Sequence, residues 1–327
     1  MPLSDLTLDE LRRYRPERVE PADFDAFWKR SLAESAEVPL APRFEPHECG
    51  LRLVDVYDTR FAGFGGDEIA AWLIVPKGAT GVGCVVEYLG YSSGRGFPQD
   101  HLAWPAAGWA LLVVDTRGQG ANASHSPGIT GDPYPAREPH APGALTRGIA
   151  SPDTYYYRRV ITDSVRAVDV AAGHPAVDSS RVIVVGGSQG GALSQSVAAL
   201  HPGVAAACVD VPFLSDFRRA AEIASTGPYP EIVRYLAAHR DQDERVFATL
   251  SYFDGVNFAA RATVPALYSV ALMDTTCPPS TVFAAYHQWG GRKDIEVYPW
   301  NGHEGGEGWQ FAKQLAFVDR HLPQTRT

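Results

Sequence analysis

The segment 184–191, Val-Val-Gly-Gly-Ser-Gln-Gly-Gly, constrains the fold and the chemistry of this chain more than any other. It is an apolar run that ends in Gly-x-Ser-x-Gly, a pattern that predicts a sharp strand-to-helix turn presenting Ser188 to solvent. Such a turn is strained, and side chains two residues before and after the serine would collide. Gly186 and Gly190 remove those side chains. The segment therefore predicts a serine placed for nucleophilic attack.

The flanking sequence decides between this interpretation and an ordinary glycine-rich turn. Residues 181–185, Arg-Val-Ile-Val-Val, are the β-branched run typical of a strand buried on both faces. Apolar residues recur through 192–200 and stop before His-Pro-Gly at 201–203, as in a short helix. Because strand, turn and helix follow in the required order, we favour the nucleophile turn.

Composition limits the architecture and the partners. The 327 residues are 45% hydrophobic, enough for one large α/β domain, so we expect a single domain over 1–327. The formal net charge is −9 and basic residues never cluster beyond a pair, so nucleic acid is not an expected partner. Residues 1–12 lack the features of a signal peptide and no apolar run reaches bilayer length. We expect a cytoplasmic protein with no membrane partner.

The four cysteines, Cys49, Cys84, Cys208 and Cys277, are scattered without metal-ligand spacing. They are interpreted as reduced thiols rather than as a disulfide framework or a metal site. No metal and no other cofactor is expected. Cys277 differs from the others because it follows a candidate catalytic acid by three residues.

Hydrophobic patterns predict a helix over 21–33 and then a mostly parallel sheet of eight strands flanked by helices. The predicted strands are 51–61, 68–76, 83–89, 110–115, 181–186, 205–211, 265–273 and 294–298. The first two read as an antiparallel hairpin, and Ser188 follows the fifth strand. An antiparallel start followed by a βα series is the plan of the α/β-hydrolase fold.

Three segments lie outside this minimal sheet. Residues 1–50 are an N-terminal extension with the predicted helix. Residues 120–150 are rich in Pro, Gly and Ala, and a loop of this length is typical of a functional or assembly element. Residues 212–262 are helical in pattern, at 217–224, 231–239 and 243–251, and form a cap-like insertion between the sixth and seventh strands.

A serine nucleophile needs a histidine that takes its proton and a carboxylate that orients the histidine. In this fold the chain order is serine, acid, histidine. His303 follows the last predicted strand inside a glycine-rich loop and is the preferred base. The other histidines after Ser188 are interpreted as surface or capping residues: His201, His239, His287 and His321.

Asp274 is the preferred acid because it closes the seventh predicted strand, where the fold requires a carboxylate. Asp254 is a further candidate. Asp210 and Asp216 flank the end of the sixth strand, where a carboxylate can also orient the histidine, so these alternatives stay open. The oxyanion of the reaction needs two N–H donors, and the backbone of Gln189 and of Tyr91 can supply them. Tyr91 is also a candidate for lining the pocket.

Several blocks resemble carbohydrate esterase family seven, the acetyl xylan esterases and cephalosporin C deacetylases. The most specific are Arg-Gly-Gln-Gly at 117–120, Gly-Gly-Ser-Gln-Gly at 186–190 and His-Glu at 303–304. Further blocks at 14–18, 23–28 and 94–98 extend the resemblance over nearly the whole chain. The resemblance implies the same roles for Ser188, His303 and Asp274, and the same two oxyanion donors. Arg117 is interpreted as a brace for loops near the site.

The resemblance also implies an activity and an assembly. It predicts a serine carboxylesterase that deacetylates small substrates such as acetylated xylo-oligosaccharides and cephalosporin C, with Tyr91 and Pro228 in the substrate pocket. It predicts a homohexamer, with 120–150 as the assembly segment. A serine peptidase and a broad short-chain carboxylesterase of the same fold are alternatives, and a non-catalytic binding protein is a third.

Overall fold

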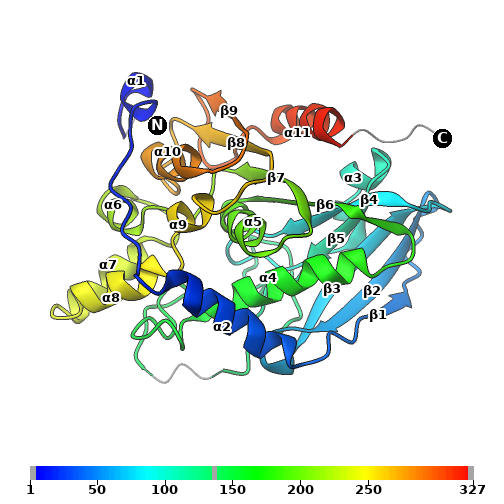
Figure 1. Cartoon of the computed structure of the whole chain (residues 1–327), viewed down its shortest axis with the longest axis horizontal. Helices are drawn as coiled ribbons and strands as arrows, with labels where there is room; N and C mark the ends of the chain where they lie inside the picture. The colour runs from blue at the N-terminus through cyan, green and yellow to red at the C-terminus, as the bar shows by residue number, and fades with distance from the viewer. Residues whose placement is uncertain (1–4, 135–137, 323–327) are drawn as a thin grey trace.

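The apolar runs along the chain form one sheet in the computed structural model, which describes residues 5–134 and 138–322 (Figure 1). Its strand order is β1-β2-β3-β5-β4-β6-β7-β8-β9. The strands β1 to β3 and the β3–β5 pair are antiparallel, and every later pair is parallel. The strands are β1 (Arg43–Pro46), β2 (Val54–Ala62), β3 (Glu68–Pro76), β4 (Val82–Tyr88), β5 (Ala110–Val114), β6 (Val177–Gly187), β7 (Val204–Asp210), β8 (Ala266–Ala271) and β9 (Lys293–Tyr298).

The prediction of eight strands was wrong by one, because the described residues form a nine-stranded sheet. The additional strand, β1, pairs with β2 at the sheet edge and places Ser188 after the sixth strand rather than the fifth. Its four residues, Arg-Phe-Glu-Pro, are mostly exposed and carry no alternating apolar pattern. Pairing with a neighbour, not its own sequence, makes this segment a strand. The predicted hairpin is confirmed as β2 and β3.

Helices cover both faces of the sheet. On one face α4 (Tyr156–Ala172) and α5 (Gln189–Leu200) pack against the central strands, α10 (Pro279–Gln288) packs against β8, and α2 (Phe24–Ala36) packs on α4 (Figure 1). On the other face lie α3 (Ala103–Ala106) and α11 (Glu307–His321). The short helix α1 (Leu8–Leu11) contacts α10. Among the helices of the described residues, none combines the length and apolar character that crossing a bilayer requires.

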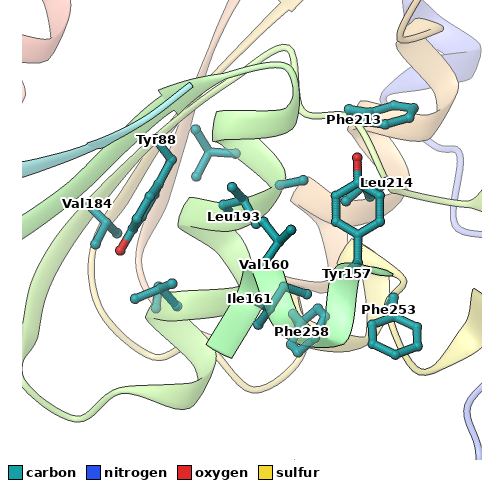
Figure 2. Close-up of a cluster of buried hydrophobic side chains, with 14 of the residues drawn as sticks. Tyr88, Tyr157, Val160, Ile161, Val184, Leu193, Phe213, Leu214, Phe253 and Phe258 are labelled. Atoms are coloured by element: carbon teal, nitrogen blue, oxygen red, sulfur yellow. The ribbon is translucent and has the colours of Figure 1, made fainter. Parts of the chain in front are cut away.

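The alternation of side chains along β6 divides the core between these faces. Val182 and Val184 belong to the larger cluster, between the sheet and α4 and α5, whereas Ile183 and Val185 belong to the smaller cluster under α11. Figure 2 shows part of the larger cluster, which includes Val184 of β6, Val160 of α4 and Leu193 of α5. Because β6 is buried on both faces, the turn at its end is held rigidly.

Between β7 and β8 the chain forms four helices, α6 (Phe217–Ile223), α7 (Pro230–Ala238), α8 (Asp243–Ser251) and α9 (Gly255–Ala259). The helices predicted within 212–262 agree with α6, α7 and α8 to within a residue at each end. In the predicted loop, the described residues 120–134 and 138–150 form no helix or strand, while 135–137 lie outside the described residues. Residues 1–4 of the expected extension and 323–327 also lie outside them.

Arg117 joins this loop to the body of the protein, as the sequence interpretation expected. Its guanidinium is fully buried and binds Asp163 of α4, with Nε 2.5 Å from Oδ2 and Nη2 2.9 Å from Oδ1. Nη1 also binds Asp67, 2.9 Å away, and lies 3.5 Å from Asp132 in the loop. The positive charge of the guanidinium therefore lies next to three carboxylates that are buried or half-buried.

Replacing Arg117 with Met tests this arrangement. The substitution leaves the buried carboxylate of Asp163 without its ion-pair partner, so we expect the free energy of unfolding to fall by about 3–5 kcal/mol. Urea denaturation measures the change. Arg43→Met, which removes an exposed ion pair with Glu68, is the control and should cost at most about 1 kcal/mol. Equal small losses in both variants would contradict the assignment.

Candidate active site

The backbone of Ser188 adopts the strained geometry that the sequence predicts. It has φ 58° and ψ −118°, between β6 and the first residue of α5. A Cβ atom on Gly190 would lie 2.0 Å from the carbonyl oxygen of Tyr88, and one on Gly186 would lie 2.4 Å from the backbone of Gly190. Neither position tolerates a side chain. Both glycines are therefore required where the chain turns under the serine.

The structure brings Ser188, His303 and Asp274 into one hydrogen-bonded line. Nε2 of His303 lies 2.9 Å from Oγ of Ser188, and Nδ1 lies 2.8 Å from Oδ2 of Asp274. His303 follows β9 in a tight loop, where Gly305 and Gly306 have φ 65° and 91°. Three residues from distant parts of the chain thus meet in the order that proton transfer from a serine to an oriented histidine requires.

Asp274 is fixed on its other side by its own turn. The carboxylate is fully buried, and its Oδ1 accepts hydrogen bonds from the backbone N–H groups of Thr276 (2.8 Å) and Cys277 (2.9 Å). Oδ2 is left to face the imidazole. The carboxylate is thereby held by donors that cannot rotate away, which suits an acid that orients a histidine.

The other candidate acids have different partners. Asp216 accepts the Tyr14 hydroxyl, and Asp254 caps α9 by accepting the backbone N–H of Val256. Asp210 ends β7 beside the site, but its oxygens accept the side-chain amides of Gln310 and Gln314. The structure therefore separates these three from His303 and pairs Asp274 with it.

Outside the site, the other histidines after Ser188 have partners or packing of their own. His201 binds Asp169, and His287 lies 3.2 Å from the backbone oxygen of Leu11. His239 stacks against Tyr235 of α7. His321 packs on Phe317 at the end of α11.

The two predicted oxyanion donors flank the serine. In the part of the chain that the structure describes, neither the Tyr91 nor the Gln189 backbone N–H donates to a protein acceptor. Gln189 is the first residue of α5, where an unsatisfied N–H is inherent in helix geometry. Tyr91 lies in the loop after β4 and lines the same cavity as Ser188. Both amides are thus available to a developing negative charge.

Side chains buried behind these amides hold the two donors in place. The side-chain oxygen Oε1 of Gln189 accepts hydrogen bonds from Tyr157 and Gln119, each 2.8 Å long, and Nε2 of Gln189 donates to the backbone oxygen of Leu89. Gln119 also accepts the backbone N–H of Ser92. The contacts join the loop after β4 to α5. Sequence reasoning missed Gln119 and Tyr157, although the Arg-Gly-Gln-Gly block did mark Gln119.

The side chain of Tyr91 is anchored in the inserted segments. Its hydroxyl donates to Glu231 of α7 (2.9 Å) and accepts the backbone N–H groups of Ala144 and Leu145. Glu231 also accepts the Leu145 N–H, 3.0 Å away. Gly143 leaves room for this carboxylate, because a Cβ there would lie 2.1 Å from Oε1. Glu231 is a third residue that sequence reasoning missed.

A cavity of about 590 Å³ opens in front of the serine. Tyr91 and Pro228 line it, as the sequence interpretation expected, together with Ser188 and His303. Cys277 is fully buried behind the site, and burial raises the pKa of its thiol well above the ordinary value. The thiol is therefore neutral at physiological pH. Among the described residues, no group of three or more His, Cys, Asp or Glu side chains is arranged to hold a metal ion.

Burial raises the pKa of Asp210 to about 7, and the amides of Gln310 and Gln314 offset only part of this effect. An unfolded aspartate has a pKa of about 3.9. Between about pH 4 and pH 7 the unfolded chain therefore binds fewer protons than the folded one at this position. The contribution of Asp210 to stability falls as the pH rises through this range and is constant above it.

Asp210→Asn isolates this effect, because asparagine cannot ionise. We expect the free energy of unfolding of the variant, relative to wild type, to rise by roughly 1 kcal/mol per pH unit between about pH 5 and pH 7. Urea denaturation across this range measures the difference. Asp319→Asn, on the exposed surface of α11, is the control. A difference between Asp210→Asn and wild type that stays constant with pH would refute the assignment.

The mostly parallel sheet, its covering helices and the serine turn at the end of β6 make this an α/β-hydrolase fold. The chain belongs to the acetyl xylan esterase (AXE1) family, whose model matches residues 1–321. Members of this family are carboxylic ester hydrolases. The family match confirms the resemblance drawn from the sequence blocks.

Individual relatives agree with the family match. The chain is similar to an acetyl xylan esterase from Paenibacillus sp. R4, with 38% identity over 97% of this chain and 100% of that one and a TM-score of 0.92. The acetyl xylan esterase 1 structure from Thermoanaerobacterium sp. JW/SL YS485 is 33% identical over 96% of this chain and 99% of that one, with a TM-score of 0.89. The acetyl esterase Axe7A of Xylanibacter ruminicola is 29% identical over 88% of this chain, and the match spans only 65% of that relative.

Proposed function

We propose that this protein is an acetyl esterase that removes acetyl groups from small substrates. Acetylated xylo-oligosaccharides are its principal substrates, and cephalosporin C is a further substrate. The observation that carries the proposal is the line from Ser188 through His303 to Asp274 at the wall of the cavity. Family membership and the acetyl esterases among its relatives support the choice of acyl group. The cytoplasmic location and the homohexamer stay predictions.

In the first half of the reaction His303 takes the proton of Ser188 through Nε2 while Oγ attacks the acetyl carbonyl carbon. The carbonyl oxygen becomes an oxyanion and accepts the Tyr91 and Gln189 N–H groups. His303 then gives the proton to the leaving sugar oxygen as the C–O bond breaks. The acetyl group is left on Ser188.

In the second half a water molecule replaces the sugar. His303 removes a proton from the water, which attacks the acetyl-enzyme, and the same two amides stabilise the second oxyanion. The proton returns to Oγ as acetate leaves. Asp274 holds the imidazole in the required tautomer and balances its positive charge in both halves. His303 accepts and donates the proton in every proton-transfer step of the reaction.

Ser188→Ala tests the assignment on acetyl, butyryl and octanoyl esters and on acetylated xylo-oligosaccharides. Because the nucleophile is lost, we expect kcat to fall by about 10⁴-fold or more. Labelling by a fluorophosphonate probe should disappear in the same variant. Ser251→Ala, on α8 away from the cavity, should retain wild-type turnover and labelling.

The chain-length series and an amide substrate separate the alternatives. Wild type should prefer the acetyl ester over the butyryl ester and the butyryl over the octanoyl ester. Highest kcat/KM on the octanoyl ester would refute the acetyl esterase. Equal rates across short acyl chains would indicate a broad short-chain carboxylesterase. Turnover of a peptide amide at a rate comparable to that of the acetyl ester would indicate a serine peptidase. Absence of serine labelling in wild type would indicate a non-catalytic binding protein.

A further inference from the structure

The cavity in front of Ser188 is lined by acidic side chains. Four of the residues that line it are acidic, namely Asp210, Glu231, Glu304 and Glu307. Among the described residues that line it, none is a lysine or an arginine, and the side chains that can become positive are His125 and His303. Acidic side chains therefore outnumber basic ones in the described lining of the cavity.

The two outer carboxylates lie close to the reacting groups in the sequence and are exposed. Glu304 follows His303 directly, and its Oε1 accepts the side-chain amide of Asn301, 2.8 Å away. This hydrogen bond lowers the pKa of Glu304, which is therefore ionised at neutral pH. Glu307 is the first residue of α11 and is also exposed. These two place negative charge at the entrance to the cavity.

The two inner carboxylates are of a different kind. Glu231 is buried on α7 and holds Tyr91, and burial raises the pKa of Glu231. Asp210 is held by two glutamine amides, and its pKa is raised as well. An additional negative charge entering the cavity would be close to Glu304 and Glu307, which line the same cavity. No described lysine or arginine in the lining would compensate for its loss of water.

An acetyl ester itself carries no charge, so this lining does not oppose it. A carboxylate on the alcohol part of the substrate is repelled at short range, where protein walls reduce screening by water. The product acetate is also an anion and gains no ion pair with a lysine or arginine in the described lining. The lining thus distinguishes the uncharged ester from anions of similar size.

We propose that the cavity selects uncharged acetyl esters over acetyl esters whose alcohol part carries a carboxylate, and that Glu304 and Glu307 determine this specificity. The proposal rests on the proposed acetyl esterase function and narrows its substrate class. It ranks neutral acetylated sugars above acetylated uronic acids, and above cephalosporin C, whose ring bears a carboxylate.

A matched pair of substrates tests the selection. 4-Acetoxybenzamide and 4-acetoxybenzoate differ chiefly in charge, and dividing each kcat/KM by the rate constant for hydroxide-catalysed hydrolysis removes their intrinsic difference. We expect the corrected neutral-to-anionic ratio to be about tenfold for wild type at low salt. Added salt should lower the ratio, because the outer carboxylates are exposed.

Variants locate the source of the selection. Glu304→Gln and Glu307→Gln should each lower the ratio by about two- to threefold. The measured quantity is the corrected neutral-to-anionic ratio of kcat/KM. A disturbed loop that lowers activity on both substrates equally leaves this ratio unchanged. Asp319→Asn makes the same change in net charge on the same helix, α11, at an exposed position outside the cavity lining. This control should leave the ratio unchanged.

Two results would overturn the proposal. One is a corrected ratio near one in wild type. The other is a ratio that Asp319→Asn lowers as much as Glu307→Gln, because the overall net charge of −9 would then be responsible. Failure of the acetyl esterase function is a separate outcome, in which wild type hydrolyses the neutral ester no faster than Ser188→Ala does.

Discussion

The site depends on one backbone conformation, the positive φ of Ser188 at the end of β6. A non-glycine residue adopts this conformation only where the surroundings enforce it. Here β6 is buried on both faces, α5 begins at the next residue, and Gly190 lies against the Tyr88 carbonyl where no side chain fits. The strain points Oγ toward His303 and leaves the Gln189 amide free at the start of α5.

Buried polar contacts extend this constraint to segments that are not part of the sheet. Gln119 and Tyr157 hold Gln189, while Glu231 and the backbone at 144–145 hold Tyr91. The long loop and the first part of the helical insertion therefore support the oxyanion donors directly. Such networks are effective when each member is satisfied, because the low dielectric strengthens every bond. The inserted segments are thus part of the site, whatever further role they have in assembly.

The features that sequence predicts well here are local ones. A β-branched run, a glycine-flanked serine and a helical repeat lie within twenty residues, so their order alone indicates the serine turn. His303 and Asp274 follow from chain order in this fold, and the structure places both beside Ser188. The strand β1 could not be found this way, since its pairing with β2 and not its own pattern makes it a strand.

Contacts between distant segments also escape sequence reasoning. Glu231 stands 140 positions from Tyr91, and no local pattern links a glutamate on a cap helix to a loop tyrosine. Likewise, Asp210 ends β7 and Asp274 lies three residues after the end of β8, and only the side-chain geometry shows that one faces glutamine amides and the other faces the histidine. The charge of the cavity has the same origin, because its acidic residues come from three separate parts of the chain.

The most direct test of the account is to trap the covalent intermediate. Wild type mixed with excess 4-nitrophenyl acetate, quenched in acid within the first turnover and digested, should show one added acetyl group on the peptide that contains Ser188. The same peptide from Ser188→Ala should show none. An acetyl group on Cys277, or full turnover with no acetylated peptide at any time, would contradict the assignment of Ser188 as the nucleophile.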